Sequence, residues 1–207
     1  MLLLVSGATA TIRRLRDVHP NHLGHLLTPR GGNVDSVFGT GLPWAADNDC
    51  FNRLDPVAFR RMLTVIRGRT RCLFVTCPDV VANAVATLDR FREWSEEIRS
   101  TGQPIAFVGQ DGAEDCELPW SEFDAWFVGG SDAWKLCRAS WELMAEAKRR
   151  GKWVHVGRVN SFRRLMWCHD HGADSADGSS MSKFSDHYIN RFCWFVRGLE
   201  QQPVWWE

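Results

Sequence analysis

Ala125-Trp126-Phe127-Val128 is an uninterrupted apolar run that ends at Gly129-Gly130-Ser131, and a helical pattern follows from about Asp132 to Arg149. Such a run is typical of a strand that is covered on both faces, as in a parallel sheet. Further apolar runs of this kind cover residues 72–77, 104–108 and 153–156. Each is followed by a polar turn and then a helical pattern, so the chain is built from repeated strand-helix units.

The remaining elements fit between these runs. A first strand is expected over Leu2 to Ser6 and a short one over Ala173 to Ala176. A helix should begin at Asp55-Pro56, because Asp caps free amides and Pro fits the first helical turn. Its apolar face would hold Val57, Phe59, Met62, Leu63 and Ile66. Further helices are expected over residues 81–101, up to about 169, and 182–199.

Strands that alternate with helices at intervals of roughly 25 to 30 residues predict right-handed β-α-β units and a parallel sheet. Seven or eight such units indicate an α/β fold, a small, closed TIM-like (β/α)8 barrel, and we expect residues 1–207 to form it as a single domain. An open, doubly wound sheet is the alternative. The first strand is not followed by Gly-x-Gly-x-x-Gly, which argues against the nucleotide-binding form of that fold.

The composition points to no charged partner. Lys and Arg number 25 and Asp and Glu also number 25, so contact with a polyanion must come from a local basic group. The seven Cys residues include no Cys-x-x-Cys pair, which indicates reduced thiols and a cytoplasmic protein. The apolar run from Met1 to Val5 is far too short for a signal sequence or a membrane span, so we expect no membrane partner.

Three histidines at a spacing of three residues, His19, His22 and His25, suggest metal ligands on one helical face. Pro20 and Gly24 interrupt that face, and no acidic ligand lies near it. Structural or solvent-exposed roles are therefore favoured, and no metal site is predicted.

Polar residues follow the predicted strands. In a parallel barrel the active site lies at the carboxyl ends of the strands, so these residues should meet at one rim. Several carboxylates there can supply a nucleophile, a proton shuttle and acceptors for the N–H groups of a base. An Asp after a strand is also a common helix cap, but capping does not require the Gln, Gly-Gly, Arg and Asn that accompany it. The residues of this predicted rim are Asp47, Asp79, Gln110, Asp111, Gly129, Gly130, Arg158, Asn160, Asp174 and Asp177.

The densest basic group beside this rim consists of Arg158, Arg163 and Arg164, with Asn160 as a neutral donor. Such a group suits a phosphate backbone, and a solvated helix face is the open alternative. Ser131 begins a helix, where it either helps to bind a phosphate through backbone amides or caps the helix.

Three segments carry a resemblance to a known family. They are Phe107-Val108-Gly109-Gln110-Asp111-Gly112, then Phe127-Val128-Gly129-Gly130-Ser131 with Trp134-Lys135-Leu136, and His155-Val156-Gly157-Arg158-Val159-Asn160-Ser161 followed by Asp174-Ser175-Ala176-Asp177-Gly178. In order and spacing they resemble the tRNA-guanine transglycosylase superfamily, and within it the phage and bacterial DNA-guanine transglycosylases. The resemblance extends from about Pro43 to Ser180.

This family is a (β/α) barrel in which an Asp attacks the anomeric carbon, guanine leaves, and a 7-deazaguanine base displaces the enzyme. The resemblance implies that Asp177, the second Asp of an Asp-x-x-Asp strand end, is the nucleophile, and that Asp47 is the general acid/base. It also implies that Asp79 reads the N–H edge of the purine. The groups that would read the purine carbonyl are Gln110 and the amides of Gly129 and Gly130.

The remaining predicted contacts divide into two sets. Asp174, the first Asp of the same strand end, is grouped with the substrate-binding residues. The residues assigned to phosphate or nucleic acid are Lys135, Arg158, Asn160, Arg163 and Arg164.

The sequence departs from the tRNA enzymes at several points. Nothing matches their Cys-x-Cys-x-x-Cys and His zinc site, so we expect no zinc and no other cofactor. The chain is much shorter, which favours DNA or a smaller nucleotide over tRNA. After Asp177 the family has a Leu-Pro-Thr-Arg-like run, whereas this chain has Gly178-Ser179-Ser180.

The resulting expectation is an enzyme that replaces guanine in DNA with a 7-deazaguanine such as preQ0, in the cytoplasm, or in the host cytoplasm if the chain is phage-encoded. Its partners are DNA and the 7-deazaguanine base. Two alternatives stay open. One is a hydrolase or base-exchange enzyme that acts on free purine nucleosides or nucleotides, and the other is a purine-binding barrel without catalysis of its own. A homodimer and a separate partner subunit are also open.

Overall fold

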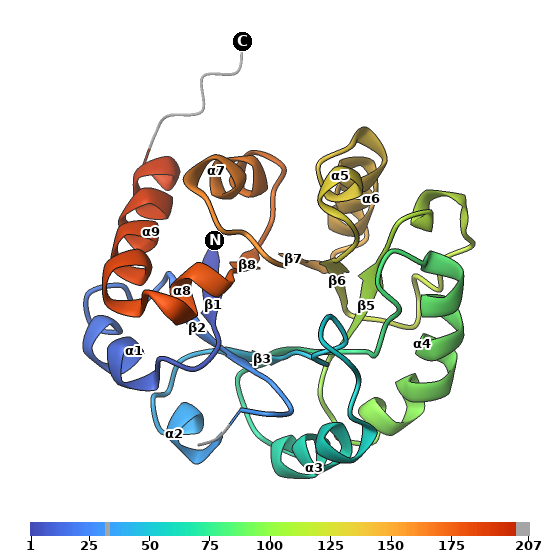
Figure 1. Ribbon diagram of the computed structural model, residues 1–207, viewed down its shortest axis with the longest axis horizontal. Coiled ribbons are helices and arrows are strands. Elements are labelled where there is room, and N and C mark those ends of the chain that lie inside the picture. The colour runs from blue at the N-terminus through green and yellow to red at the C-terminus, as the bar shows by residue number, and fades with distance from the viewer. Residues whose placement is uncertain (32–33, 202–207) are drawn as a thin grey trace.

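The computed structural model describes residues 1–31 and 34–201. At its centre is a closed barrel of eight parallel strands, in which each strand pairs with the next and β8 pairs with β1 (Figure 1). The strands are β1 (Leu2–Val5), β2 (Leu23–Leu27), β3 (Trp44–Ala46), β4 (Cys72–Thr76), β5 (Ile105–Gly109), β6 (Ala125–Val128), β7 (Trp153–Val156) and β8 (Ser175–Asp177). This topology confirms the predicted TIM-like (β/α)8 barrel and excludes the open sheet.

Helices follow the strands and surround the barrel (Figure 1). Those in the described residues are α1 (Thr9–Leu15), α2 (Val34–Phe38), α3 (Pro56–Ile66), α4 (Ala84–Arg99), the short 3₁₀ helix η1 (Ala113–Asp115), α5 (Asp132–Lys135), α6 (Arg138–Arg149), α7 (Phe162–Asp170), α8 (Ser179–Lys183) and α9 (Ser185–Glu200). Within residues 1–31 and 34–201, no helix combines the length and the apolar character needed to cross a bilayer.

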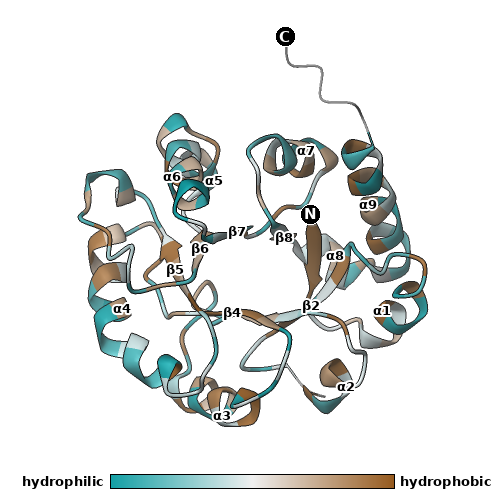
Figure 2. Ribbon diagram, turned by 180° about the vertical axis from the view of Figure 1, so that it is seen from behind, coloured by the Kyte–Doolittle hydropathy of each residue, from teal (hydrophilic) through white to brown (hydrophobic). Residues whose placement is uncertain are grey.

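Apolar side chains fill two layers. Successive strand residues point alternately into and out of the barrel. The inner layer includes Leu4, Phe74 and Phe127, and the outer layer, between strands and helices, includes Phe91 and Trp126. Hydrophilic residues lie on the outer turns of α4 and α6 (Figure 2). The inner layer forms the floor on which a site at the carboxyl ends of the strands is built.

Several predicted elements have the expected bounds. Strands β6 and β7 cover the predicted residues 125–128 and 153–156. Helix α3 begins as expected, since the Asp55 side chain accepts hydrogen bonds from the amides of Val57 and Ala58. The side chain of Val57 is 68% exposed, so its predicted place on the apolar face is wrong.

Strand β2 is not among the strands predicted from the sequence, because Gly24 and His25 interrupt its apolar residues. A Cβ at Gly24 would lie 2.8 Å from the carbonyl oxygen of Pro43, so the barrel wall has room only for glycine there. His25 is buried, and its Nε2 lies 3.0 Å from the Thr40 hydroxyl. The Nε2 side of this buried histidine is thus satisfied within the protein, while its Nδ1 has no hydrogen-bond partner in the described part of the chain.

Two predicted helices are each divided in the structure. The helix expected over 132–149 is interrupted at Leu136 and Cys137, between α5 and α6. The helix expected over 182–199 is interrupted at Phe184, between α8 and α9. Strand β8 begins at Ser175 and ends at Asp177, later than the predicted strand over residues 173–176.

Candidate active site

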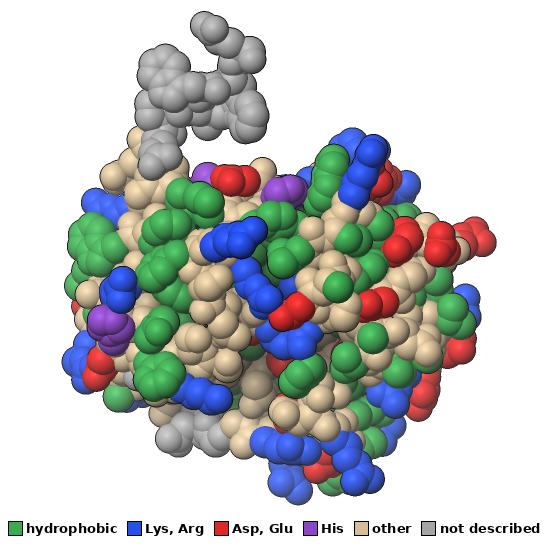
Figure 3. All heavy atoms as spheres, turned by 45° about the horizontal axis from the view of Figure 1, so that its top comes forward, with side chains coloured by type: hydrophobic (Ala, Val, Ile, Leu, Met, Phe, Trp, Pro, Cys, Tyr) green, Lys and Arg blue, Asp and Glu red, His purple; other side chains and the backbone are tan. Residues whose placement is uncertain are grey.

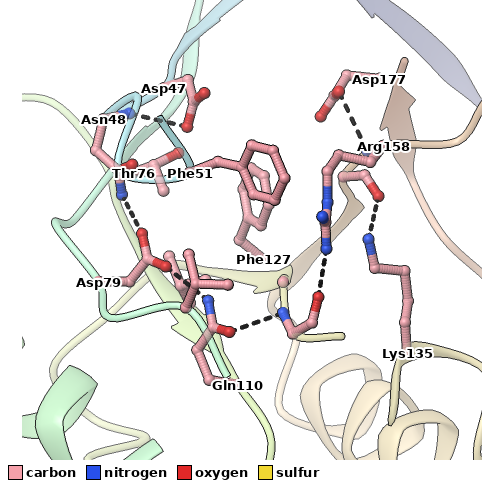
Figure 4. Close-up of a pocket in the computed structure, with 15 residues that line it drawn as sticks. Asp47, Asn48, Phe51, Thr76, Asp79, Gln110, Phe127, Lys135, Arg158 and Asp177 are labelled. Atoms are coloured by element: carbon pink, nitrogen blue, oxygen red, sulfur yellow. Dashed lines mark hydrogen bonds between the residues drawn. The ribbon is translucent and has the colours of Figure 1, made fainter. Parts of the chain in front are cut away.

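One cavity opens at the carboxyl ends of the strands. It encloses about 500 Å³, counting the space that is open to solvent. Asp47 and Asp177 lie on opposite sides of it, with the rings of Phe51 and Phe127 between them (Figure 4). The lining residues are Asp47, Asn48, Phe51, Thr76, Asp79, Val81, Val108, Gln110, Phe127, Gly129, Gly130, Lys135, Gly157, Arg158 and Asp177. Eight of the predicted site residues therefore meet around one space.

Asp47 follows β3 and carries a carboxyl group that resists ionisation. Burial raises its pKa to about 7, and the nearby charges of Asp177 and Asp79 act in the same direction. The amide of Asn48 donates to Asp47 Oδ1 at 2.8 Å and opposes this shift only in part. A carboxyl group that is about half protonated near neutrality can both donate and accept a proton.

Asp79 follows β4 and is buried between two amide side chains. Asn48 Nδ2 donates to its Oδ1 at 2.8 Å, and Gln110 Nε2 donates to its Oδ2 at 2.6 Å. Burial raises the pKa of Asp79, and these hydrogen bonds oppose the shift. Asn48 is itself fixed, because it donates to the carbonyl of Cys77 and accepts from the amide of Cys50. The two amides hold the Asp79 carboxylate in one orientation.

Gln110 and the two glycines differ from their predicted roles. Gln110 Oε1 already accepts the amides of Ala82 at 2.8 Å and Gly130 at 2.9 Å, and the Gly129 amide donates to the carbonyl of Gly109 at 3.0 Å. Gly129 and Gly130 line the cavity, but their N–H groups are engaged and do not point a donor at a ligand. The second hydrogen of Gln110 Nε2 is the remaining donor in this group.

Asp177, at the end of β8, has both carboxylate oxygens held. His155 Nε2 lies 2.9 Å from Oδ2, and the backbone amide of Arg158 donates to Oδ1 at 3.2 Å. The carboxylate faces the cavity (Figure 4). A carboxylate fixed in this way is suited to attack an electrophilic carbon placed above it.

Two cations approach Asp177 from neighbouring loops. Lys135 is buried, and its Nζ donates to the carbonyl of Gly157 at 2.6 Å. Burial lowers the pKa of Lys135 to about 8, with Arg158 acting in the same direction and Asp177 opposing it. Arg158 donates to the carbonyl of Gly130, and its guanidinium lies 4.4 Å from the ring centre of Phe51. Lys135 is therefore a cavity residue and does not belong to an exposed phosphate-binding surface.

Asp174 is the clearest correction to the predicted site. It precedes β8 and so lies at the amino end of the barrel, where its carboxylate accepts hydrogen bonds from Lys148 Nζ at 2.7 Å and from the amide of Val154 at 2.8 Å. Successive strand residues are about 3.3 Å apart, which places Asp174 roughly 10 Å below Asp177. Asp174 therefore connects β8 to α6 through Lys148 and does not contact a substrate in the cavity.

The predicted phosphate-binding residues outside the cavity have mixed surroundings. Arg164 forms an ion pair with Asp132 at 2.7 Å, and this guanidinium lowers the pKa of Asp132. The Asn160 side chain accepts from the amide of Ser180 at 3.0 Å. Arg163 is exposed, and its guanidinium has no hydrogen-bond or ion-pair partner among residues 1–31 and 34–201.

Ser131 acts as a cap. Its hydroxyl accepts from the amide of Trp134 and donates to Asp111, and its own amide also donates to Asp111. Both donors of Ser131 itself, its hydroxyl and its amide, are thus bound to Asp111.

Seven of the lining residues were not predicted from the sequence, namely Asn48, Phe51, Thr76, Val81, Val108, Phe127 and Gly157. Thr76 is 1% exposed, and its Oγ1 has no hydrogen-bond partner in the described part of the chain. The rings of Phe51 and Phe127 supply apolar walls. Thr76 and Phe127 lie in apolar strands, so only the alternation of side chains in the barrel reveals that they face the cavity. Phe51 lies in the loop after β3, where no strand pattern indicates its direction.

The three histidines considered as metal ligands do not form one face. Nε2 of His19 lies 2.7 Å from Asn190, His22 lies near Glu200, and His25 bonds to Thr40. Across residues 1–31 and 34–201, no three His, Cys, Asp or Glu residues are grouped so that they could hold a metal ion.

The fold and the cavity define a (β/α)8 barrel with carboxylates at the carboxyl rim. No family model matches the chain, and no curated protein matches it. Among solved structures, a mutant tryptophan synthase alpha-subunit from the hyperthermophile Pyrococcus furiosus is similar, with a TM-score of 0.59, 12% sequence identity, and coverage of 98% of each chain. At this identity the likeness shows the fold alone. The resemblance to guanine transglycosylases and the roles of the site residues stay predictions.

Proposed function

We propose that the protein exchanges guanine in DNA for a 7-deazaguanine base through a covalent bond between Asp177 and the sugar. The observation that carries this proposal is the meeting of Asp47, Asp79 and Asp177, from the ends of three strands, around one cavity. The three carboxylates differ in surroundings, as a nucleophile, a proton shuttle and a recognition group require.

In the first step, a carboxylate oxygen of Asp177 forms a bond to C1′ while the bond from C1′ to the purine nitrogen breaks. The electron pair of that bond goes to the purine, and the Asp47 carboxyl supplies the proton that the departing guanine needs. The anomeric carbon is cation-like as the base departs, so the carboxylate stabilises it before capturing it. In duplex DNA the target base has to leave the stack first.

In the second step, Asp47, now ionised, accepts a proton from the incoming 7-deazaguanine, whose ring nitrogen attacks C1′ and displaces Asp177. The carboxylate is regenerated and Asp47 is again protonated. No water is consumed, provided that the cavity keeps water from C1′ between the two steps.

Base recognition follows from the hydrogen-bond inventory. The Asp79 oxygens face the cavity with lone pairs beyond those used by Asn48 and Gln110, and they suit the N–H edge of guanine. The remaining hydrogen of Gln110 Nε2 suits the guanine carbonyl. The hydroxyl of Thr76, which has no partner among the described residues, is a further donor or acceptor for the base or the sugar.

Exchange or hydrolysis on free purine nucleosides or nucleotides is the second candidate. It is favoured by the arrangement of the basic residues, because Arg158 and Arg164 are already bound to Gly130 and Asp132. Fewer cations are then left for a phosphate backbone.

Incubation of the protein with labelled guanine and either DNA or free guanine nucleosides separates the two candidates. We expect label in DNA, and a denaturation-resistant adduct whose linked peptide contains Asp177. The D177N variant should form neither product, while D89N, which changes an exposed carboxylate on α4, should retain both. Label in nucleosides but never in DNA would overturn the DNA assignment.

We place this activity in the cytoplasm, or in the host cytoplasm for a phage-encoded chain. All seven cysteines are free, in keeping with a reducing compartment.

A further inference from the structure

A chain of hydrogen-bonded side chains leads from Trp153 to the carboxylate of Asp177. Trp153 Nε1 donates to Ser175 Oγ at 2.9 Å, Ser175 Oγ lies 2.8 Å from His155 Nδ1, and His155 Nε2 lies 2.9 Å from Asp177 Oδ2. His155 and Ser175 are both completely buried. None of these contacts was anticipated from the sequence, since His155 sits within an apolar run.

The strand register of the barrel produces this chain. Strands β7 and β8 are neighbours, and His155 is paired in register with Ser175. Residues two apart on a strand share a face, so Trp153 and His155 on β7 and Ser175 and Asp177 on β8 all point inward. The inward face of these two strands is polar, whereas Phe74 and Phe127 from β4 and β6 are apolar.

The chemistry of the donors gives the chain a direction. An indole N–H can only donate, so Ser175 Oγ accepts from Trp153. At the other end the Asp177 carboxylate can only accept, so the hydrogen of a neutral imidazole lies on Nε2, facing Asp177, and Nδ1 accepts the Ser175 hydroxyl hydrogen. The rings of Phe127 and Phe74, with centres 4.6 Å and 5.2 Å from that of His155, hold the imidazole from its sides.

The other oxygen of Asp177, Oδ1, is held by a backbone amide. Oδ1 accepts the amide that joins Gly157 to Arg158, and the carbonyl of that same peptide unit accepts the Lys135 ammonium at 2.6 Å. A cation at the carbonyl polarises the peptide and strengthens its N–H as a donor. Both oxygens of the carboxylate are thus fixed from below, and its free lone pairs face the cavity.

We propose that His155 is a positioning residue that sets the orientation of Asp177 for attack on C1′, with Ser175 and Trp153 fixing the tautomer of His155. This inference deepens the proposed function and rests on it. His155 does not line the cavity, so it acts through Asp177 and not on the substrate.

Single-turnover formation of the covalent adduct with guanine-containing DNA provides the kinetic test. H155L, which removes the donor to Asp177, should slow adduct formation by roughly 10- to 100-fold, with the concentration for half-maximal rate unchanged. H155Q offers an amide N–H to Asp177 and should recover part of the rate. H25Q is the matched control, because His25 is equally buried in β2 but bonds to Thr40 outside the cavity. Wild-type rates in both H155L and H155Q would overturn the inference.

Histidine ¹⁵N spectra provide a test that needs no substrate. In the wild-type protein His155 should carry its hydrogen on Nε2, D177N should shift the Nε2 signal, and S175A should shift the Nδ1 signal, with the His25 signals unchanged. If the hydrogen lies on Nδ1, or if D177N leaves the His155 signals unchanged, the proposed hydrogen-bond chain from Trp153 to Asp177 is wrong. If the spectra show the expected hydrogen on Nε2 but the wild type forms no adduct, the proposed reaction is wrong and the hydrogen-bond chain to Asp177 is still supported.

Discussion

Asp47 lies near two other carboxylates, and burial with their charges raises its pKa from 3.8 to about 7. The folded state therefore holds this proton more tightly than the unfolded state, so the free energy of unfolding falls as pH rises from about 4 to about 7. D47N removes this penalty, so at pH about 8 its free energy of unfolding should exceed that of the wild type by up to about 4 kcal/mol. Urea titration measures this difference. Near pH 4 the two proteins should be equally stable, and a constant difference at both pH values would contradict the assignment.

The same proton sets the expected pH dependence of adduct formation. Above pH about 7 the protonated fraction of Asp47 falls, so the single-turnover rate should fall about tenfold for each further pH unit. D47N has no proton to lose and should be slow at every pH, with no decline on the alkaline side. Rates measured across this range decide the role, since a wild-type profile that stays flat would assign proton donation to another group.

Thr76 presents to the cavity a buried hydroxyl that has no hydrogen-bond partner within residues 1–31 and 34–201. An unsatisfied buried hydroxyl lowers stability, so T76V should be as stable as the wild type or more stable by about 1 kcal/mol. If the hydroxyl binds the substrate, T76V should raise KM roughly tenfold, because the bound ligand then loses one hydrogen bond. Thermal unfolding together with steady-state kinetics separates these effects. An unchanged KM would leave Thr76 without a substrate contact.

At the level of elements, the sequence predicts the strands and helices whose patterns are strong. Strands β6 and β7 are buried on both faces and read as apolar runs, and Asp55 marks the start of α3 by its capping chemistry. Strand β2 is not predicted, because Gly24 is needed where the backbone passes close to Pro43, and His25 bonds through its Nε2 to Thr40, which lies outside the strand. Local patterns contain neither fact.

In the candidate site, too, some features follow from local sequence patterns and others depend on contacts between distant segments. Asp47 and Asp79 follow apolar runs, and Asp177 follows a short predicted strand, so the barrel rule predicts where they meet. Asp174 lies three residues before Asp177, and only the true start of β8 shows that it belongs to the other end of the barrel. The inward direction of His155 depends on its register with β8, which sequence periodicity does not give.

The loops after β7 and β8 approach closely at Gly178. A Cβ there would lie 2.2 Å from the carbonyl oxygen of Val159, whose amide in turn donates to the carbonyl of Asp177. G178A should therefore separate the two loops, cost about 1 to 3 kcal/mol in stability, and slow adduct formation by displacing Asp177. G198A in α9, where an added Cβ meets nothing within 4 Å, should be neutral or slightly stabilising. Wild-type stability and rate in G178A would refute this packing account.

Across the whole molecule, positive and negative charges are equal in number, so binding of a polyanion depends on where they lie. Lys and Arg side chains lie around the hollow in Figure 3, with Asp and Glu side chains among them. Ion pairs such as the one between Arg164 and Asp132 neutralise part of this surface. A nucleic-acid substrate would rely most on cations that have no partner in the part of the chain that the structure describes.

Arg163 is such a cation, exposed on α7 beside the candidate site. If the substrate is DNA, R163A should weaken binding at low salt and reduce the slope of log affinity against log salt by about one, because one phosphate contact is lost. R61A removes an exposed arginine from α3 and should leave both quantities unchanged. Fluorescence anisotropy with a labelled oligonucleotide over a salt series measures both variants. Equal salt slopes for R163A, R61A and wild type would argue against a phosphate contact at Arg163, and a flat response in all three would favour a free nucleoside or nucleotide as the substrate.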